Sequence, residues 1–194
     1  MLDHALQLFK DTSVASIAPT TTYCVKKIAT SISFDKADLI VEYGPGDGAL
    51  TKYLLENMRA DAKLIIIETN DHFVSVLRDE FEDPRLTIVH DSAENILDIR
   101  KQLGFHKADY IISGIPYSLI PQNVKEEMIK DSSRILKDGG KFIIYQALTA
   151  ITARRSLKDT VQKHFDTTAH RSYLFNLPPL YVFEALKRKE PLFI

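Results

Sequence analysis

A chain of 194 residues, 45% of them hydrophobic, is long enough to bury a sizeable core and too short for two large domains. Its 25 basic and 26 acidic residues leave a formal charge of -1. The overall charge therefore does not favour binding to a polyanion, and only a local basic patch could attract one. The single cysteine, Cys24, excludes an internal disulfide, and the six histidines lack metal-binding spacing, so no metal is expected.

The first part of the chain is expected to form a helical lead over residues 1–35. Two short helices are predicted, at 2–11 and 20–32. The first is mildly amphipathic, which fits either a helix packed on the core or a peripheral contact with a membrane surface. The chain shows neither a signal peptide pattern nor an apolar run of the roughly 18 residues that a membrane span needs. A cytoplasmic protein is therefore expected.

From residue 36 onward, strand-like and helix-like segments alternate with almost no filler. Five short β-rich runs are apolar nearly throughout, as expected for strands covered on both faces. They are 38–44, 63–69, 85–91, 108–114 and 141–147. The helical patterns that follow them place apolar residues on one face. These faces are Leu50, Leu54 and Met58; Phe73, Leu77 and Phe81; Ile96, Ile99 and Leu103; Val124, Met128 and Ile135; and Ile151, Leu157, Val161 and Phe165.

The end of the chain breaks this alternation. Two strand patterns, 170–176 and 180–188, follow each other with only the sequence LPP between them, which predicts an antiparallel hairpin. We therefore predict an α/β fold with a doubly wound, Rossmann-like sheet of seven strands, mostly parallel with a C-terminal antiparallel hairpin. One domain over 1–194 is expected, with a core at 36–194.

The stretch GPGDGA after the first strand indicates a nucleotide-like ligand. Glycines there allow positive φ and close approach of the backbone, while the next helix offers unpaired N–H groups. Gly44, Gly46 and Ala49 satisfy the dinucleotide pattern, with Glu68 at the expected distance. The spacing of Glu42 ahead of these glycines, together with the terminal hairpin, favours S-adenosylmethionine instead. A tight turn without a ligand is the structural alternative.

Acidic residues end the second and third strands. Glu68 could accept hydrogen bonds from both ribose hydroxyls of a nucleotide, or it could be a solvated acid at a helix start. Asp91 could accept from an adenine amino group, and the backbone of Ser92 or Ala93 could meet the ring edge. The same stretch, DSAEN, is also a good helix cap.

The fourth strand ends in GIPY, Gly114 to Tyr117, where the chemistry is expected. In an open parallel sheet this loop lies at the crevice beside the glycine turn. Pro116 restricts Ile115 and removes a donor, so local carbonyls could face an incoming amine. Tyr117 could lie against a planar or cationic group, and a structural loop with a buried tyrosine is the alternative.

The motifs VEYGPGDG, IIIET, VHDSAEN and ISGIPYSLIP, in this order, resemble those of class I S-adenosylmethionine-dependent methyltransferases. The chain is most similar to bacterial phosphatidylethanolamine N-methyltransferases, through its N-terminal lead, its proline loop and its ending. It resembles ribosomal RNA adenine dimethylases more distantly. The resemblance implies S-adenosylmethionine as the cofactor and assigns its binding to a set of matching positions. They are Glu42, Gly44, Gly46, Glu68, Asp91 and Ser92.

The resemblance also bears on the methyl acceptor. Gly114 stands where adenine dimethylases carry a polar side chain that helps to hold the target amino group. A lipid head group or a small amine is therefore expected, and nucleic acid is disfavoured but left open. The GIPY carbonyls and the Tyr117 hydroxyl are candidates for orienting the nitrogen. An RNA adenine methyltransferase, a nicotinamide-dependent oxidoreductase and a non-catalytic cofactor-binding domain remain alternatives.

Overall fold

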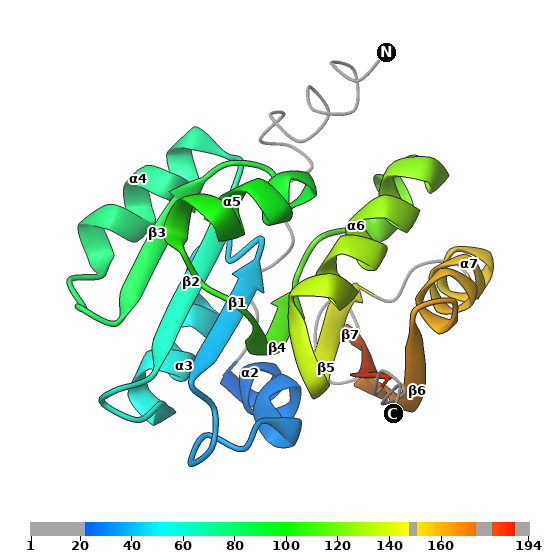
Figure 1. Ribbon diagram of the computed structural model, residues 1–194, viewed down its shortest axis with the longest axis horizontal. Coiled ribbons are helices and arrows are strands. Elements are labelled where there is room, and N and C mark those ends of the chain that lie inside the picture. Colours follow the sequence, from blue (N-terminus) through cyan, green and yellow to red (C-terminus); the bar gives the residue numbers. More distant parts are fainter. Residues whose placement is uncertain (1–21, 148–150, 174–179, 189–194) are drawn as a thin grey trace, which may run out of the picture.

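The computed structural model describes residues 22–147, 151–173 and 180–188. Its strands form one sheet in the order β3-β2-β1-β4-β5-β7-β6 (Figure 1). The strands are β1 (Leu39–Tyr43), β2 (Lys63–Glu68), β3 (Leu86–His90), β4 (Ala108–Ser113), β5 (Leu136–Ala147), β6 (Phe165–Tyr173) and β7 (Leu180–Lys187). The helices are α2 (Thr22–Ile28), α3 (Ala49–Asn57), α4 (Asp71–Glu80), α5 (Ile96–Leu103), α6 (Gln122–Ile135) and α7 (Ile151–Gln162), with 3-10 turns η1 (Ala29–Ser31), η2 (Ala93–Asn95) and η3 (Tyr117–Leu119).

The strand pairing confirms the predicted fold class. Strands β1 to β5 pair in parallel, whereas β7 is antiparallel to both β5 and β6. The chain runs outward from β1 to β3 and then returns to place β4 on the other side of β1. In sheets of this kind, such a reversal of direction places the ligand-binding crevice at the carboxyl ends of the two strands on either side of it, here β1 and β4.

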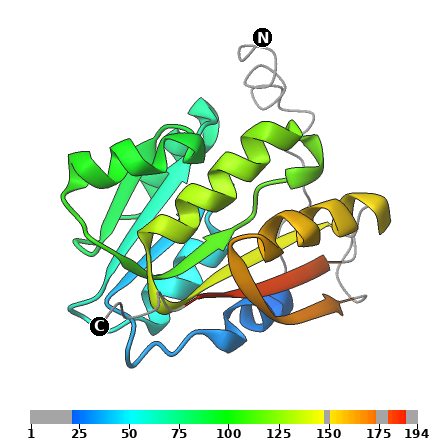
Figure 2. The ribbon, with the colours of Figure 1, turned by 45° about the vertical axis from the view of Figure 1, so that its right-hand side comes forward.

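Alternating side chains build one hydrophobic layer on each face of the sheet. The helices that cover the two faces are seen in Figures 1 and 2. Val41 and Tyr43 of β1 point into the layer that α5, α6 and α7 cover. Ile40, in the same strand, points into the layer of α2, α3 and α4. By the same alternation Glu42 belongs to the second layer, together with Tyr145 of β5.

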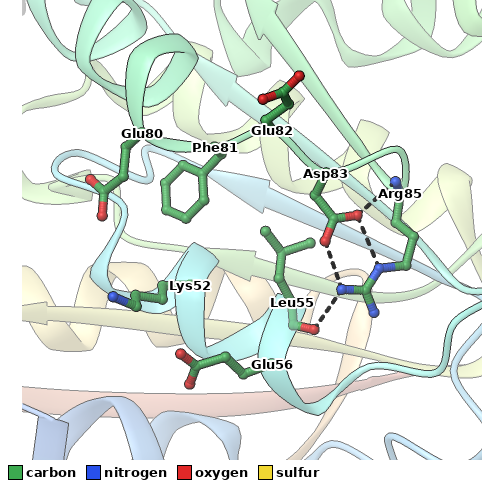
Figure 3. Close-up of a pocket in the computed structure, with 8 residues that line it drawn as sticks. All are labelled: Lys52, Leu55, Glu56, Glu80, Phe81, Glu82, Asp83 and Arg85. Atoms are coloured by element: carbon green, nitrogen blue, oxygen red, sulfur yellow. Dashed lines mark hydrogen bonds and ion pairs between the residues drawn. The ribbon is translucent and has the colours of Figure 1, made fainter.

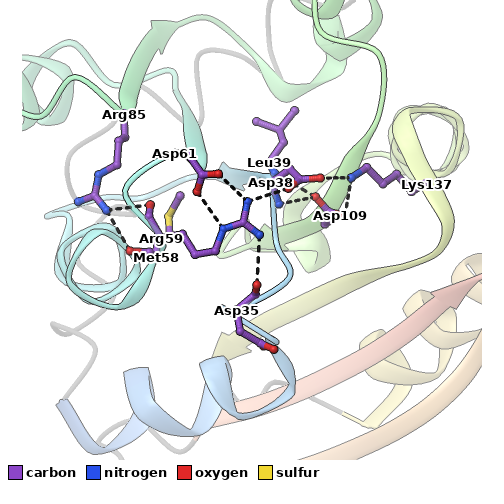
Figure 4. Close-up of polar contacts among 9 residues, drawn as sticks. All are labelled: Asp35, Asp38, Leu39, Met58, Arg59, Asp61, Arg85, Asp109 and Lys137. Atoms are coloured by element: carbon purple, nitrogen blue, oxygen red, sulfur yellow. Dashed lines mark hydrogen bonds and ion pairs between the residues drawn. The ribbon is translucent and has the colours of Figure 1, made fainter.

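The amino-terminal edge of the sheet is held by a network of ion pairs around Arg59 (Figure 4). Its guanidinium lies 3.0 Å from the Asp38 carboxylate, ahead of β1, and 2.9 Å from Asp61, ahead of β2. Lys137 of β5 pairs with Asp38 at 2.9 Å and with Asp109 of β4 at 2.8 Å. These contacts tie the starts of four strands together and leave the carboxyl edge for the glycine turn.

Three residues predicted on helix faces, Met58, Phe81 and Phe165, lie outside the helices, and Leu103 lies within its helix but is exposed. Helix α4 ends at Glu80, so Phe81 follows the helix, and a side chain added at Gly48 would meet its ring at 2.7 Å. Leu103 ends α5 and is 43% exposed. Phe165 belongs to β6 and is buried, because α7 stops at Gln162.

The predicted N-terminal lead is described only in part. The helix expected at 20–32 is found as α2, continued by η1, with Cys24 and Ile28 fully buried. The helix expected at 2–11 lies outside the described residues, as does part of the strand expected at 170–176. Over the ranges that the structure covers, no helix is both long and apolar enough to cross a bilayer.

Candidate functional site

The glycine turn after β1 is left-handed at three positions, with φ of 66° at Gly44, 57° at Gly46 and 80° at Gly48. A side chain at Gly44 would press on Ile115 at 3.3 Å, which shows how closely this turn approaches the fourth-strand loop. A Cβ built at Gly46 meets no atom within 4 Å. The Gly46 backbone therefore borders open space and suits close approach of a ligand.

Glu68 lies against this turn at the end of β2. Its carboxylate is 7% exposed and accepts hydrogen bonds from the backbone amides of Thr69 at 2.8 Å and Asn70 at 2.9 Å. Its other oxygen accepts from the Gly46 amide at 3.2 Å. The structure thus brings together Glu68 and Gly46, two residues predicted to bind the cofactor. A carboxylate has about four lone-pair sites, so these three bonds leave room for a ribose hydroxyl.

Glu42 has an oxygen without a partner in the protein. Its side chain is 0% exposed, and Oε2 accepts from the Thr51 hydroxyl of α3 at 2.7 Å, while Oε1 has no hydrogen bond to any residue described. Burial raises the pKa of this carboxyl to about 8, and the negative charge of Glu68 adds to the rise. A buried oxygen of this kind fits the positively charged amino group of S-adenosylmethionine.

The loop after β3 has the capping geometry that its sequence predicts. Asp91 accepts from the amide of Ser92 at 2.6 Å and from the side chain of Asn95 at 2.7 Å. The Ser92 hydroxyl caps η2 by accepting from the Glu94 amide at 3.2 Å, and Ala93 is buried. The Asp91 amide donates to the Glu68 carbonyl at 3.1 Å, so the two acidic strand ends are adjacent. Contact of this loop with adenine stays a prediction.

The GIPY loop lies next to the glycine turn. The Gly114 amide donates to the Tyr43 carbonyl at 2.9 Å. Three of the carbonyls that we expected to face an amine already accept backbone hydrogen bonds: Ile115 from the Tyr117 amide and Pro116 from the Leu119 amide, both at 2.9 Å, and Tyr117 from the Ile120 amide at 3.3 Å. Each carbonyl keeps a second lone pair, so the orienting role of this loop stays a prediction.

Tyr117 is packed into the core beside β4. Its side chain is 1% exposed, and its hydroxyl is 3.1 Å from the Ser113 hydroxyl. Burial raises the pKa of the phenol above its usual value, so it stays protonated. The ring lies in the layer of α5, α6 and α7, opposite the face that carries Glu42. Contact with an acceptor would require this loop to move.

The packing and acceptor roles of Tyr117 can be separated. Replacing Tyr117 by phenylalanine removes its bond to Ser113, which we expect to lower the free energy of unfolding by about 1 kcal/mol and to leave cofactor affinity unchanged. Denaturant unfolding and calorimetric titration measure these effects. If the fully folded variant methylates amines at the normal rate, the hydroxyl has no part in orienting the acceptor.

Two further residues at the carboxyl edge of the sheet were not predicted as site residues. Thr51 is fully buried on α3 and binds Glu42. Tyr145 lies near the end of β5, with its hydroxyl 2.6 Å from a Cβ built at Gly114. The alternation of side chains in strand 141–147 could have placed Tyr145 on the face of Glu42, whereas Thr51 carries no distinctive sequence signal.

A separate hollow of about 420 Å³ lies between α3 and the segment after α4 (Figure 3). Its lining mixes both charges, and Arg85 is held there by Asp83 at 2.7 Å and by the Leu55 carbonyl at 2.8 Å. The segment that holds Arg85 leads into the amino end of β3. The predicted site residues do not line this hollow, so we place the functional site at the carboxyl edge instead.

The sequence matches known proteins over most of its length. Residues 20–180 match the family described as ribosomal RNA adenine dimethylase. An ornithine lipid N-methyltransferase of Singulisphaera acidiphila is 26% identical over 132 residues, which span 68% of this chain and 69% of that protein. Ribosomal RNA small subunit methyltransferase A of Mycoplasma capricolum is 36% identical over 97 residues, which span 48% of this chain but only 34% of that protein.

The fold also matches solved structures. The crystal structure of the N-methyltransferase NodS from Bradyrhizobium japonicum, in complex with S-adenosyl-L-homocysteine, superposes with a TM-score of 0.70 at 12% identity. The superposition covers 96% of this chain and 98% of NodS. The buried oxygen of Glu42 and the open backbone at Gly46 fit S-adenosylmethionine as the cofactor. The chain therefore belongs to the ribosomal RNA adenine dimethylase family and is an S-adenosylmethionine-dependent methyltransferase.

Proposed function

We propose that this methyltransferase acts on the amine of a lipid head group. The supporting observation is the glycine at position 114, where a Cβ would lie 2.6 Å from the Tyr145 hydroxyl and 3.0 Å from the Gly44 carbonyl. With the Tyr145 hydroxyl in this position, the site does not accommodate the polar side chain with which adenine dimethylases hold their target amino group. The alignment with the ornithine lipid enzyme, over about two thirds of both chains, supports the same reading.

The charges at the carboxyl edge also favour a cationic acceptor. Burial raises the pKa of the Tyr145 phenol, and the nearby carboxyl groups of Glu42, Asp47 and Glu68 raise it further. Glu42 keeps its proton up to about pH 8, so Asp47 and Glu68 give this edge its acidic character, which attracts an ammonium group and repels the phosphates of RNA. RNA adenine remains the second candidate because the family match covers residues 20–180.

The residues at this edge divide into holding and orienting groups. Glu68, the Gly46 amide and Glu42 would hold S-adenosylmethionine, which supplies a methyl group on a positively charged sulfur. Transfer of such a group is an in-line displacement, so the protein needs no covalent nucleophile and must align a nitrogen lone pair and exclude water. An alkyl ammonium with a pKa of about 10 must first lose a proton. The GIPY loop is the proposed place for this alignment.

The acceptor class is tested by offering the full chain three substrates. Detergent micelles that contain ornithine lipid or phosphatidylethanolamine, unmodified small-subunit ribosomal RNA, and soluble ethanolamine are each incubated with S-adenosylmethionine labelled in its methyl group. We expect the label to appear in the lipid amine. Label in RNA adenine, with none in lipid, would assign the second candidate instead.

A further inference from the structure

Tyr145 lies where the three central strand ends meet. In the register of β4 and β5, Ser113 lies opposite Ile144, so Tyr145 is level with Gly114. Its side chain is 8% exposed and belongs to the layer of α2 and α3. Glu42 is on the same face by the alternation of β1. The phenol therefore reaches the crevice from the opposite side of the sheet to Tyr117.

The Tyr145 hydroxyl occupies the space that a side chain at position 114 would fill. A Cβ built on Gly114 would lie 2.6 Å from the hydroxyl oxygen, 2.8 Å from the adjoining ring carbon and 3.0 Å from the carbonyl of Gly44. All three distances are at or below the limit for real contacts. The hydroxyl thus lies directly over the Gly114 backbone, at the end of β4 and beside the glycine turn.

This hydroxyl is not used by the fold. No hydrogen bond joins it to any residue within the described ranges, in contrast to the hydroxyls of Tyr43, Tyr110 and Tyr117, which are bonded to Ser132, Ser33 and Ser113. Burial, together with the carboxyl groups of its surroundings, raises the pKa of the phenol well above its usual value. The group is therefore a neutral hydroxyl with a donor and two acceptor lone pairs available.

We infer that the Tyr145 hydroxyl contacts the acceptor nitrogen and orients it for methyl transfer, in place of the side chain that position 114 lacks. The inference rests on the proposed function. The hydroxyl oxygen accepts one N–H of the neutral amine, which leaves the nitrogen lone pair free to form the new N–C bond. The electrons of the broken C–S bond stay on sulfur, and the methylated ammonium releases its extra proton to water.

The first test replaces Tyr145 by phenylalanine in the full chain. The probes are micelles of ornithine lipid and of phosphatidylethanolamine, with S-adenosylmethionine labelled in its methyl group. We expect kcat/KM for the lipid to fall by about tenfold to a hundredfold, because the amine loses a hydrogen bond in the transition state. The Kd for S-adenosylhomocysteine and the midpoint of thermal unfolding should stay unchanged, because no other residue described depends on this hydroxyl.

The matched control is Tyr53→Phe. Tyr53 is a half-buried tyrosine of α3 whose ring packs edge-on against Phe34. Removing its hydroxyl is the same chemical change at a position outside the crevice, and the rate should stay within about twofold of that of the unmodified protein.

The second test uses Gly114→Ala, which should displace the Tyr145 hydroxyl and so lower the rate in the same way. In the double variant with Tyr145→Phe, the combined loss should be smaller than the product of the two single losses, because both changes remove the same hydroxyl from the acceptor, although the new Cβ still meets the ring carbon and the Gly44 carbonyl. Losses that multiply would overturn the inference. So would a normal rate in Tyr145→Phe, or a rate that falls only in step with cofactor affinity and thermal stability. If the unmodified protein methylates neither lipid, the proposed function and this inference both fall.

Discussion

Replacing Glu42 by glutamine is expected to stabilise the protein by about 3 to 5 kcal/mol near pH 8 and to change its stability little near pH 4. The carboxyl is completely buried, and one of its oxygens has no partner among the described residues. Burial raises its pKa from 4.5 to about 8. Glutamine keeps the size of the side chain and an oxygen for Thr51, but it cannot ionise.

The sign of the effect follows from where the proton is held. Below about pH 4.5 both the folded and the unfolded chain hold the proton, so Glu42 does not lower the free energy of unfolding. Between about pH 4.5 and 8 the unfolded chain releases the proton while the folded chain keeps it, so stability falls as the pH rises. Above about pH 8 both are ionised and the loss is complete. Denaturant unfolding of both proteins across this range measures the difference.

A matched change at an exposed glutamate of α3, Glu56→Gln, should change the free energy of unfolding by no more than about 0.5 kcal/mol. A stability difference for Glu42→Gln that does not vary with pH would show that the pKa of the carboxyl is the same in the folded and the unfolded chain. If Glu42 pairs with the amino group of the cofactor, the glutamine variant should also bind S-adenosylmethionine at least about tenfold more weakly. The gain in stability would then come with a loss of affinity.

Glu68→Ala is expected to weaken the binding of S-adenosylmethionine by about 1 to 3 kcal/mol, which is roughly fivefold to 150-fold in Kd. The variant loses a proposed charged acceptor for the ribose hydroxyls. It also releases the Gly46, Thr69 and Asn70 amides, which Glu68 holds at 3.2, 2.8 and 2.9 Å. The glycine turn then has to be ordered by the cofactor itself, which lowers affinity further. Calorimetric titration measures the change.

The control for this variant is Glu80→Ala. Glu80 is exposed and lines the hollow beside α3, away from the carboxyl edge. Its loss should leave the Kd for the cofactor unchanged, whereas a marked effect would move the cofactor site to that hollow. An unchanged Kd for Glu68→Ala in a folded protein would show that Glu68 stabilises its own turn and does not bind the cofactor.

The central sheet could be predicted because its strands carry their own signal. Strands β1 and β2 are almost entirely buried, so nearly every residue in them is apolar, and turns mark their ends. The hairpin of β6 and β7 was predictable because no helical pattern separates them. The edge strand β3 is only half-buried, although its sequence looks as apolar as the others. Whether a strand lies at an edge depends on the order of the strands in the sheet.

The candidate site was predictable where function depends on backbone geometry. Gly44 and Gly46 do adopt positive φ, and Glu68 does meet the glycine turn. The sequence left open whether Tyr117 is buried or contacts a ligand, because the direction of a side chain in a short loop depends on the helices packed around it. The contact of Tyr145 with Gly114 joins residues from two strands, so neither segment alone reveals it.

The ion-pair network around Arg59 has an evolutionary consequence. It joins Arg59, Asp38 and Lys137 at the amino edge of the sheet, and no residue of the glycine turn or the GIPY loop takes part. Substitutions that alter what the crevice accepts therefore leave these contacts intact. A scaffold arranged in this way can diverge at one edge while the other edge keeps the strands aligned.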